Sequence, residues 1–288
     1  MRGRAIVLYC LLAYAIAWGL QFAAINLTGG DLESGAAMPW LVATMFAPTL
    51  AAIPFLVFHR PGRAGLLWKP TWPTWPLVLV AVAVPTLTAF AVLAVVQAMG
   101  WGQSGWFTFA ADGVSISGGP WVLGQGEQGW PLFLVNVAAT GLAFAGVSAV
   151  VAVGEEFGWR AFLQGHLINR LGLTGGVTAL GLIWSFWHLP GLLAGYNFPE
   201  TPILGALVIF PLELVAMSFF LAWLTITARS FWPAVVAHAA GNSIQEGVIA
   251  NLQMEAPRLY EDLTTMGVTM VIGLACWLAL KAQVRSRT

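Results

Sequence analysis

Three short segments place ionisable or amide side chains one helical turn apart within otherwise apolar stretches of the sequence. Their polar and aromatic members are Glu155, Glu156, Arg160, Trp184, His188, His238 and Asn242. Side chains four residues apart lie on one face of a helix, so each segment predicts a pair that points in one direction. Ionisable groups are costly in an apolar environment, and they usually face a cavity or one another and serve a function. These residues are therefore the candidates for chemistry.

The adjacent carboxylates of the first segment should have different partners. Glu156 and Arg160 stand four residues apart and can form an ion pair that orients the segment. The Glu155 side chain is rotated from that of Glu156 by about 100° around a helix, so it must face another helix or water. The alternative is that the whole group anchors a helix end at the cytoplasmic interface.

The two histidine segments each have two interpretations. In the first of them, Trp184 shares a face with His188 and can orient its imidazole, and Pro190 is expected to end the helix. A single buried histidine with a backbone partner is the alternative there. In the second histidine segment, small residues separate His238 from Asn242. Small residues allow helices to approach closely, both around a functional site and in ordinary helix packing.

Convergence of the three segments would assemble a hydrolytic site. Glu155 and His188 can hold and deprotonate a water, because a carboxylate that is shielded from solvent is a stronger base. His238 and Asn242 can donate hydrogen bonds to the oxyanion that forms when this water attacks a peptide carbonyl. Each such donor is typically worth about 3 kcal/mol.

The elements that must position these residues are transmembrane helices. Of the 288 residues, 59% are hydrophobic and 8% are charged, which excludes a water-solvated globular surface. A bilayer needs about 20 apolar residues per helix, and the sequence predicts a single all-α, polytopic membrane domain over residues 1–288 with about eight spans. The spans are Ala5–Asn26, Ala37–Phe58, Pro76–Met99, Pro131–Val153 running on towards Phe162, Gly175–Leu189, Ile203–Thr227, Phe231–Ala250 and Met266–Leu280. The first is longer than the roughly 7–15 residues of a signal-peptide core and is interpreted as a helix.

The basic residues predict the orientation of the bundle. With both termini cytoplasmic, 11 of the 12 Lys and Arg lie inside and only Arg258 lies outside, as the positive-inside rule requires. The segment 100–130, rich in Gly and Trp, is expected at the outer interface. Cys10 and Cys276 fall inside spans, so they imply neither a disulfide nor a zinc cluster. The balanced net charge gives no sign of a nucleic-acid partner.

The three polar segments resemble the motifs of the CPBP family, the intramembrane peptidases that include type II CAAX prenyl proteases and bacteriocin-processing, Abi-like proteins. The family pattern is Glu-Glu-x-x-x-Arg, Phe-x-x-x-His and His-x-x-x-Asn. This sequence matches its order and spacing between residues 151 and 243, within a catalytic core predicted at about 131–250. The one departure in these motifs is Trp184 in place of Phe, which keeps an aromatic wall but changes its volume beside His188.

The resemblance implies cleavage of a peptide bond near the cytoplasmic membrane face, with Glu155, His188 and His238 as the catalytic core. The family is often described as metalloproteases, and a divalent metal such as zinc and a metal-free glutamate mechanism are both open. The His-Glu-x-x-His signature of zinc peptidases is absent, so metal ligands would have to come from separate helices.

We therefore expect an integral membrane endopeptidase, in the cell membrane if the host is bacterial, that acts on a membrane-associated or CAAX-like peptide or protein substrate. A first alternative is a proton- or cation-coupled transporter in which the same residues form a relay, but the inverted repeat of such transporters is not evident. A second alternative is a non-catalytic immunity or scaffold protein. Glu213 and Glu246 also lie in apolar spans and receive no role.

Overall fold

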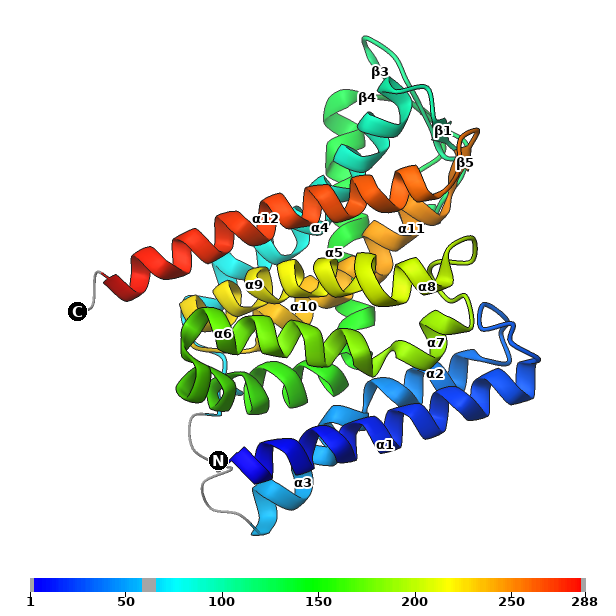
Figure 1. The fold of residues 1–288 in the computed structure, drawn as a ribbon. Coiled ribbons are helices and arrows are strands. Elements are labelled where there is room, and N and C mark those ends of the chain that lie inside the picture. The colour runs from blue at the N-terminus through cyan, green and yellow to red at the C-terminus, as the bar shows by residue number, and fades with distance from the viewer. Residues whose placement is uncertain (1–2, 59–65, 286–288) are drawn as a thin grey trace.

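The protein is a bundle of helices in the computed structural model, which describes residues 3–58 and 66–285 (Figure 1). The α-helices are α1 (Gly3–Thr28), α2 (Met38–Met45), α3 (Ala47–Phe58), α4 (Thr74–Ala98), α5 (Trp130–Glu156), α6 (Gln164–Trp187), α7 (Leu189–Leu193), α8 (Pro202–Leu204), α9 (Phe210–Ala228), α10 (Trp232–Ala240), α11 (Glu246–Ala250) and α12 (Leu259–Arg285). π-Helical segments join some of them, at Phe157–Leu163, Gly205–Ile209 and Gly241–Gln245. The all-α membrane bundle predicted from the sequence is confirmed.

Six helical stretches among the described residues are long and apolar enough to cross a membrane. They are Gly3–Thr28, Met38–Phe58, Thr74–Ala98, Trp130–Trp187, Pro202–Ala228 and Leu259–Arg285. Two of the eight predicted spans are not separate helical stretches among these six. Gly175–Leu189 falls almost wholly within the fourth stretch, and Phe231–Ala250 is divided into α10, a π-helical segment and α11. The number eight stays a prediction.

The fourth stretch is too long for a single crossing. It contains 58 residues. A straight helix of that length would extend roughly 87 Å, against about 30 Å for the hydrocarbon core of a bilayer. The chain breaks at Gly172, whose φ of 72° and ψ of 172° are not helical. Glycine adopts such a positive φ without the steric penalty of a side chain, so the stretch divides there.

Short strands cover one end of the bundle. They are β1 (Gly102–Ser104), β2 (Phe107–Phe109), β3 (Gly113–Ile116), β4 (Gly126–Gly129) and β5 (Leu252–Met254). β1 pairs antiparallel with β5, and β2, β3 and β4 form an antiparallel sheet in that order. The start of α1 and the end of α12 lie at the opposite end of the molecule from these strands (Figure 1).

Helix α10 lies inside the bundle, where it contacts α4, α5 and α9. Proline in its first turn is compatible with the helix start, because the first backbone N–H groups have no partner within a helix. The preceding helix α9 ends at Arg229, which is in the left-handed conformation with φ of 51°. This turn returns the chain so that α10 and α9 pack against each other, and it carries His238 into the interior.

The segment that follows α5 packs closely on the start of α3. Its Gly158 has no side chain, and a Cβ atom built there would lie 2.4 Å from Pro48 Cβ. One turn earlier, a Cβ atom on Gly154 would lie 2.7 Å from the carbonyl oxygen of Met45. The Thr49 hydroxyl donates a hydrogen bond of 2.6 Å to the Gly154 carbonyl oxygen. These contacts fix how closely the chain on either side of Glu155 packs against Met45, Pro48 and Thr49, and how it is rotated.

Candidate active site

The two adjacent carboxylates end α5 and lie in the interior of the protein. Glu155 is 2% exposed and Glu156 is fully buried, as is Arg160 in the π-helical segment that follows. Arg160 Nε lies 3.3 Å from Glu156 Oε2, so the ion pair predicted from their spacing is present. Fully buried charges cannot serve as an anchor at a membrane interface, and this alternative is therefore wrong.

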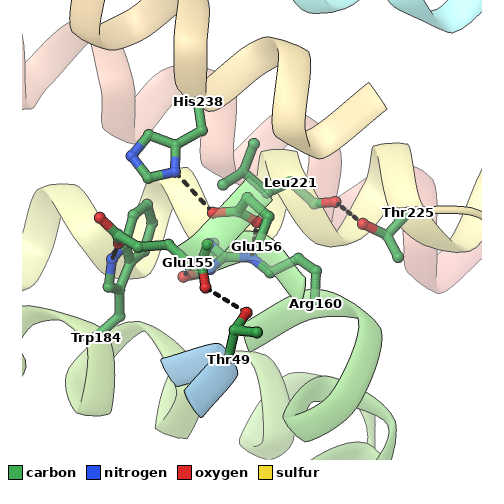
Figure 2. Close-up of polar contacts among 10 residues, drawn as sticks. Thr49, Glu155, Glu156, Arg160, Trp184, Leu221, Thr225 and His238 are labelled. Atoms are coloured by element: carbon green, nitrogen blue, oxygen red, sulfur yellow. Dashed lines mark hydrogen bonds and ion pairs between the residues drawn. The ribbon is translucent and has the colours of Figure 1, made fainter. Parts of the chain in front are cut away.

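Glu156 has a second partner that the sequence did not predict. Its Oε1 atom lies 2.9 Å from Nδ1 of His238, which comes from α10 (Figure 2). A carboxylate that is paired with arginine is ionised and only accepts hydrogen bonds, so Nδ1 of His238 carries the proton and donates it. Glu156 thus joins Arg160 on its own helix to the imidazole of a helix that is distant in the sequence.

Glu155 does face another helix, as its rotation from Glu156 predicts, and its hydrogen-bond partner there was not predicted. The indole Nε1–H of Trp184, on α6, donates a hydrogen bond of 2.7 Å to Glu155 Oε2. His188, which was expected to share a water with Glu155, places Nδ1 2.9 Å from the carbonyl oxygen of Trp184. The interpretation of His188 as a histidine with a backbone partner is therefore correct for this nitrogen.

The hydrogen bond of His188 determines which of its nitrogens is available for chemistry. A carbonyl oxygen only accepts, so Nδ1 carries a proton, and in the neutral ring Nε2 then presents a lone pair. The ring lies among aromatic groups, with centroid distances of 4.6 Å to Trp187 and 5.0 Å to Phe210. Because His188 is only partly buried, its free nitrogen can meet a water or a substrate.

Trp184 lies beside Glu155 and His238 in the polar cluster (Figure 2). Its ring centroid is 4.2 Å from Cζ of Arg160, within the range of a cation–π contact. The same ring meets His238 nearly edge to face, with centroids 5.2 Å apart and planes at 67°. The aromatic residue that was predicted to orient His188 therefore contacts both other segments of the site as well.

Asn242 stands apart from this cluster. It lies in the π-helical segment Gly241–Gln245, and its side chain is exposed and makes no hydrogen bond within the described part of the chain. A π-helix advances the chain by a wider turn than an α-helix, so residues four apart no longer lie directly on one face. The one-turn alignment of His238 with Asn242 is displaced accordingly, and the role of Asn242 as an oxyanion donor stays a prediction.

Two further residues support the cluster without having been predicted. Ser218 of α9 is fully buried, and its hydroxyl lies 3.4 Å from Nη2 of Arg160. Thr49 holds the Gly154 carbonyl at the start of the motif. A serine and a threonine in apolar spans are common in helix packing, so the sequence carries no signal that would have singled them out. The remaining intramembrane carboxylates, Glu213 and Glu246, are outside this set of contacts.

The donor atoms around the site do not fit a three-ligand metal centre. Among residues 3–58 and 66–285, no three His, Cys, Asp or Glu side chains are grouped so that they could hold a metal ion. Nδ1 of His238 faces Glu156, and Nδ1 of His188 faces a carbonyl oxygen. A structural or catalytic zinc ion usually has three or four such side-chain ligands. We therefore derive no catalytic step through a metal.

The fold and the cluster define an integral membrane protein with buried acid, base and cation side chains at the meeting point of separate helices. Comparison with known families assigns the class more narrowly. Residues 138–244 match the model of the Rce1-like family, described as type II CAAX prenyl endopeptidase Rce1-like. This segment therefore carries an Rce1-like domain, consistent with a CPBP family membrane protease, and the resemblance found in the sequence is confirmed. None of the curated proteins that were compared matches the chain.

The family match includes all three polar segments. It begins before Glu155 and ends after Asn242, and it lies inside the core predicted at about 131–250. At the level of the family, the domain is that of a membrane protease. The division of the chain into a core and the surrounding spans stays a prediction.

Proposed function

We propose that the protein is an intramembrane endopeptidase that hydrolyses a peptide bond of a membrane-associated, CAAX-like substrate with a water activated by Glu155. The observation that supports this most directly is the buried contact network of Glu155, Glu156, Arg160, Trp184 and His238. These side chains come from three segments that are far apart in the sequence. Buried ionisable groups of this kind in a membrane domain generally mark a functional site.

The two carboxylates have environments that suit different roles. Arg160 and His238 both contact the Glu156 carboxylate and compensate its negative charge. Glu156 therefore links the parts of the site and is less available to accept a proton. Glu155 is held by a neutral indole N–H and remains free to accept a proton. Neighbouring carboxylates in unlike environments commonly divide the work of catalysis in this way. We assign Glu155 as the general base and Glu156 as a positioning residue.

The proposed reaction begins with a water held between Glu155 and the Nε2 lone pair of His188. Glu155 takes a proton from this water as its oxygen attacks the carbonyl carbon of the substrate. The protonated Glu155 then gives that proton to the leaving amine as the C–N bond breaks, so the base is restored. No cofactor or second reactant is needed for this balance.

His238 is assigned to the oxyanion of the tetrahedral intermediate. It can donate from Nε2 only when both ring nitrogens carry protons, because Nδ1–H is already directed at Glu156. The Glu156 carboxylate compensates the positive charge of that form. We also propose that the exposed side chain of Asn242 meets the backbone of an arriving substrate.

The proposal is tested by replacing the base with its uncharged isostere. Glu155→Gln should lower the cleavage rate of a prenylated reporter peptide in proteoliposomes by about 10²- to 10⁴-fold, which is the usual contribution of a general base. Glu213→Gln is the matched control, since this carboxylate also lies in a membrane span but has Glu261 and Asp262 as its charged neighbours. Cleavage by Glu155→Gln at the rate of the unmodified protein would remove the mechanism.

The substrate is best sought in whole membranes. Proteomic comparison of membranes that carry the unmodified protein or Glu155→Gln should show a peptide or protein that is shortened only in the former. A proton or cation flux that depends on Glu155, without any change in membrane peptides, would support the transporter alternative instead.

A further inference from the structure

The aromatic residue of the second motif makes a contact that its counterpart in the family pattern cannot make. The pattern has Phe, and a phenyl ring has no hydrogen-bond donor, whereas Trp184 donates its indole N–H to Glu155 Oε2 over 2.7 Å. Trp184 is 3% exposed, so this hydrogen bond is shielded from solvent. We propose that Trp184 is a positioning residue that holds the Glu155 carboxylate in its reactive orientation. This inference rests on the proposed function.

The hydrogen bond leaves one carboxylate oxygen for chemistry. Glu155 Oε2 is occupied by the indole, and Oε1 is the atom that receives the proton of the water. A glutamate side chain has several rotatable bonds, and holding one of its oxygens removes most of its alternative orientations. Catalysis by a general base depends on this geometry, because the base must lie within hydrogen-bond reach of the proton that it takes.

The face of the indole ring has a second effect, on the arginine. Arg160 lies against the ring with Cζ 4.2 Å from its centroid, and it forms its ion pair with Glu156. The indole thus gives Glu155 a neutral partner while it stabilises the cation in an arrangement that compensates Glu156. A carboxylate that is paired with arginine is a weaker base, so this separation of partners favours Glu155 as the residue that takes the proton.

The backbone of the same residue extends the argument to the first histidine. The Trp184 carbonyl oxygen accepts the hydrogen bond of His188 Nδ1, while the indole edge meets the His238 ring. One residue therefore sets the geometry of the base and of the nitrogen that helps to hold the water. The indole N–H is the part of this arrangement that can be removed without moving the backbone.

The test removes the N–H and keeps an aromatic ring. In Trp184→Phe we expect kcat for the reporter peptide to fall by about 10- to 100-fold, the effect of losing one hydrogen bond to a charged group. KM should stay unchanged, because the indole N–H is directed at Glu155 and is not available to a substrate. Trp277→Phe is the matched control: Trp277 Nε1 donates over 2.9 Å to Thr174 at a distance from the site, so kcat should be unaffected.

A second substitution separates the hydrogen bond from the volume of the side chain. Incorporation of β-(3-benzothienyl)alanine at position 184 replaces the N–H by sulfur in a ring of nearly the same shape. We expect the same loss of kcat, even if Trp184→Phe is less stable. In protein that carries 15N-labelled tryptophan, the NMR signal of the Trp184 indole is identified as the one that is missing in Trp184→Phe. The chemical shift of this signal should change in Glu155→Gln. This measurement reports the contact independently of activity.

The outcomes distinguish the two proposals. Cleavage by both position-184 variants with the unmodified kcat would overturn the positioning role and leave the proposed function in place. An indole signal that does not respond to Glu155→Gln would also overturn it. If the unmodified protein cleaves no prenylated or other membrane peptide, the proposed function fails and the inference fails with it.

Discussion

At the scale of single residues, the central feature is a charged group that is completely removed from solvent. The Arg160 guanidinium has Glu156 on one side, the Trp184 ring on its face and the Ser218 hydroxyl within 3.4 Å. Burying an ion in a medium of low dielectric constant costs several kcal/mol, and an ion pair offsets this only when its geometry is good. The Arg160–Glu156 ion pair therefore serves mainly to fix the geometry of the site, and it is not a large source of stability.

This view predicts an asymmetry between single and double substitutions. Arg160→Met should lower the free energy of unfolding by about 3–5 kcal/mol, because it leaves the Glu156 carboxylate buried without its cation. Adding Glu156→Gln should recover a large part of that loss, since no uncompensated charge remains. Reversible unfolding in mixed micelles measures both values. An equal loss in the single and the double variant would contradict the asymmetry.

A prediction about metal dependence also belongs to this scale. Because no group of three potential ligands is found in the described ranges of the chain, removal of divalent ions should leave the cleavage rate unchanged. The check is activity after exhaustive dialysis against a zinc chelator, together with elemental analysis of the active protein. Loss of activity that one equivalent of zinc restores would show that the metal-free mechanism is wrong.

At the scale of elements, the site depends on a close approach between the segment after α5 and the start of α3. Gly158→Ala would place a methyl group 2.4 Å from Pro48 Cβ and close to its backbone, so one of the two segments must move. Overpacking of this kind typically costs about 1–3 kcal/mol, and the movement should also displace Glu155 and lower activity. Thermal unfolding and the peptide assay measure the two effects.

Gly165→Ala is the matched control for this prediction. Gly165 lies in the next helix, α6, and a Cβ atom there would meet nothing within 4 Å. Alanine at such a helical position should be neutral or stabilising by up to about 1 kcal/mol. If both substitutions had the same effect, helix propensity rather than the contact with Pro48 would explain it.

The sequence predicted those parts of the site that depend on spacing within one helix. The Glu156–Arg160 pair and the outward rotation of Glu155 both follow from the helical period. The hydrogen bond between Glu155 and Trp184 was not predicted, because it depends on how α5 and α6 pack, which no local pattern records. The position of Asn242 depends on a π-helical turn, and its sequence gave no sign of one.

At the scale of the whole molecule, the structure changes how the basic residues are counted. Arg160 was included among the 11 Lys and Arg assigned to cytoplasmic segments, but it is fully buried and anchors no loop. The remaining 10 still lie on one side of the predicted arrangement, because only Arg258 is placed on the other. The start of α1 and the end of α12 lie at the same end of the bundle (Figure 1), which is what the predicted even number of crossings would produce.

This arrangement predicts that the strand-covered end of the bundle faces away from the cytoplasm. The chain has two cysteines, so replacing Cys10 and Cys276 by serine gives a background in which single cysteines can be placed. Ser117→Cys, at an exposed position after β3, should react in intact cells with a maleimide that does not cross membranes. Lys69→Cys, exposed before α4, should react only after the cells are opened.

The physical basis of this prediction is that basic residues beside membrane spans are retained on the cytoplasmic side. Lys69 belongs to such a basic segment, with Arg60 and Arg63 outside the described residues, whereas the strands near Ser117 carry no Lys or Arg. Labelling of Lys69→Cys and protection of Ser117→Cys in intact cells would reverse the orientation. Partial labelling of both would show that the chain inserts in two orientations, and the charge difference would then be too weak to determine the topology.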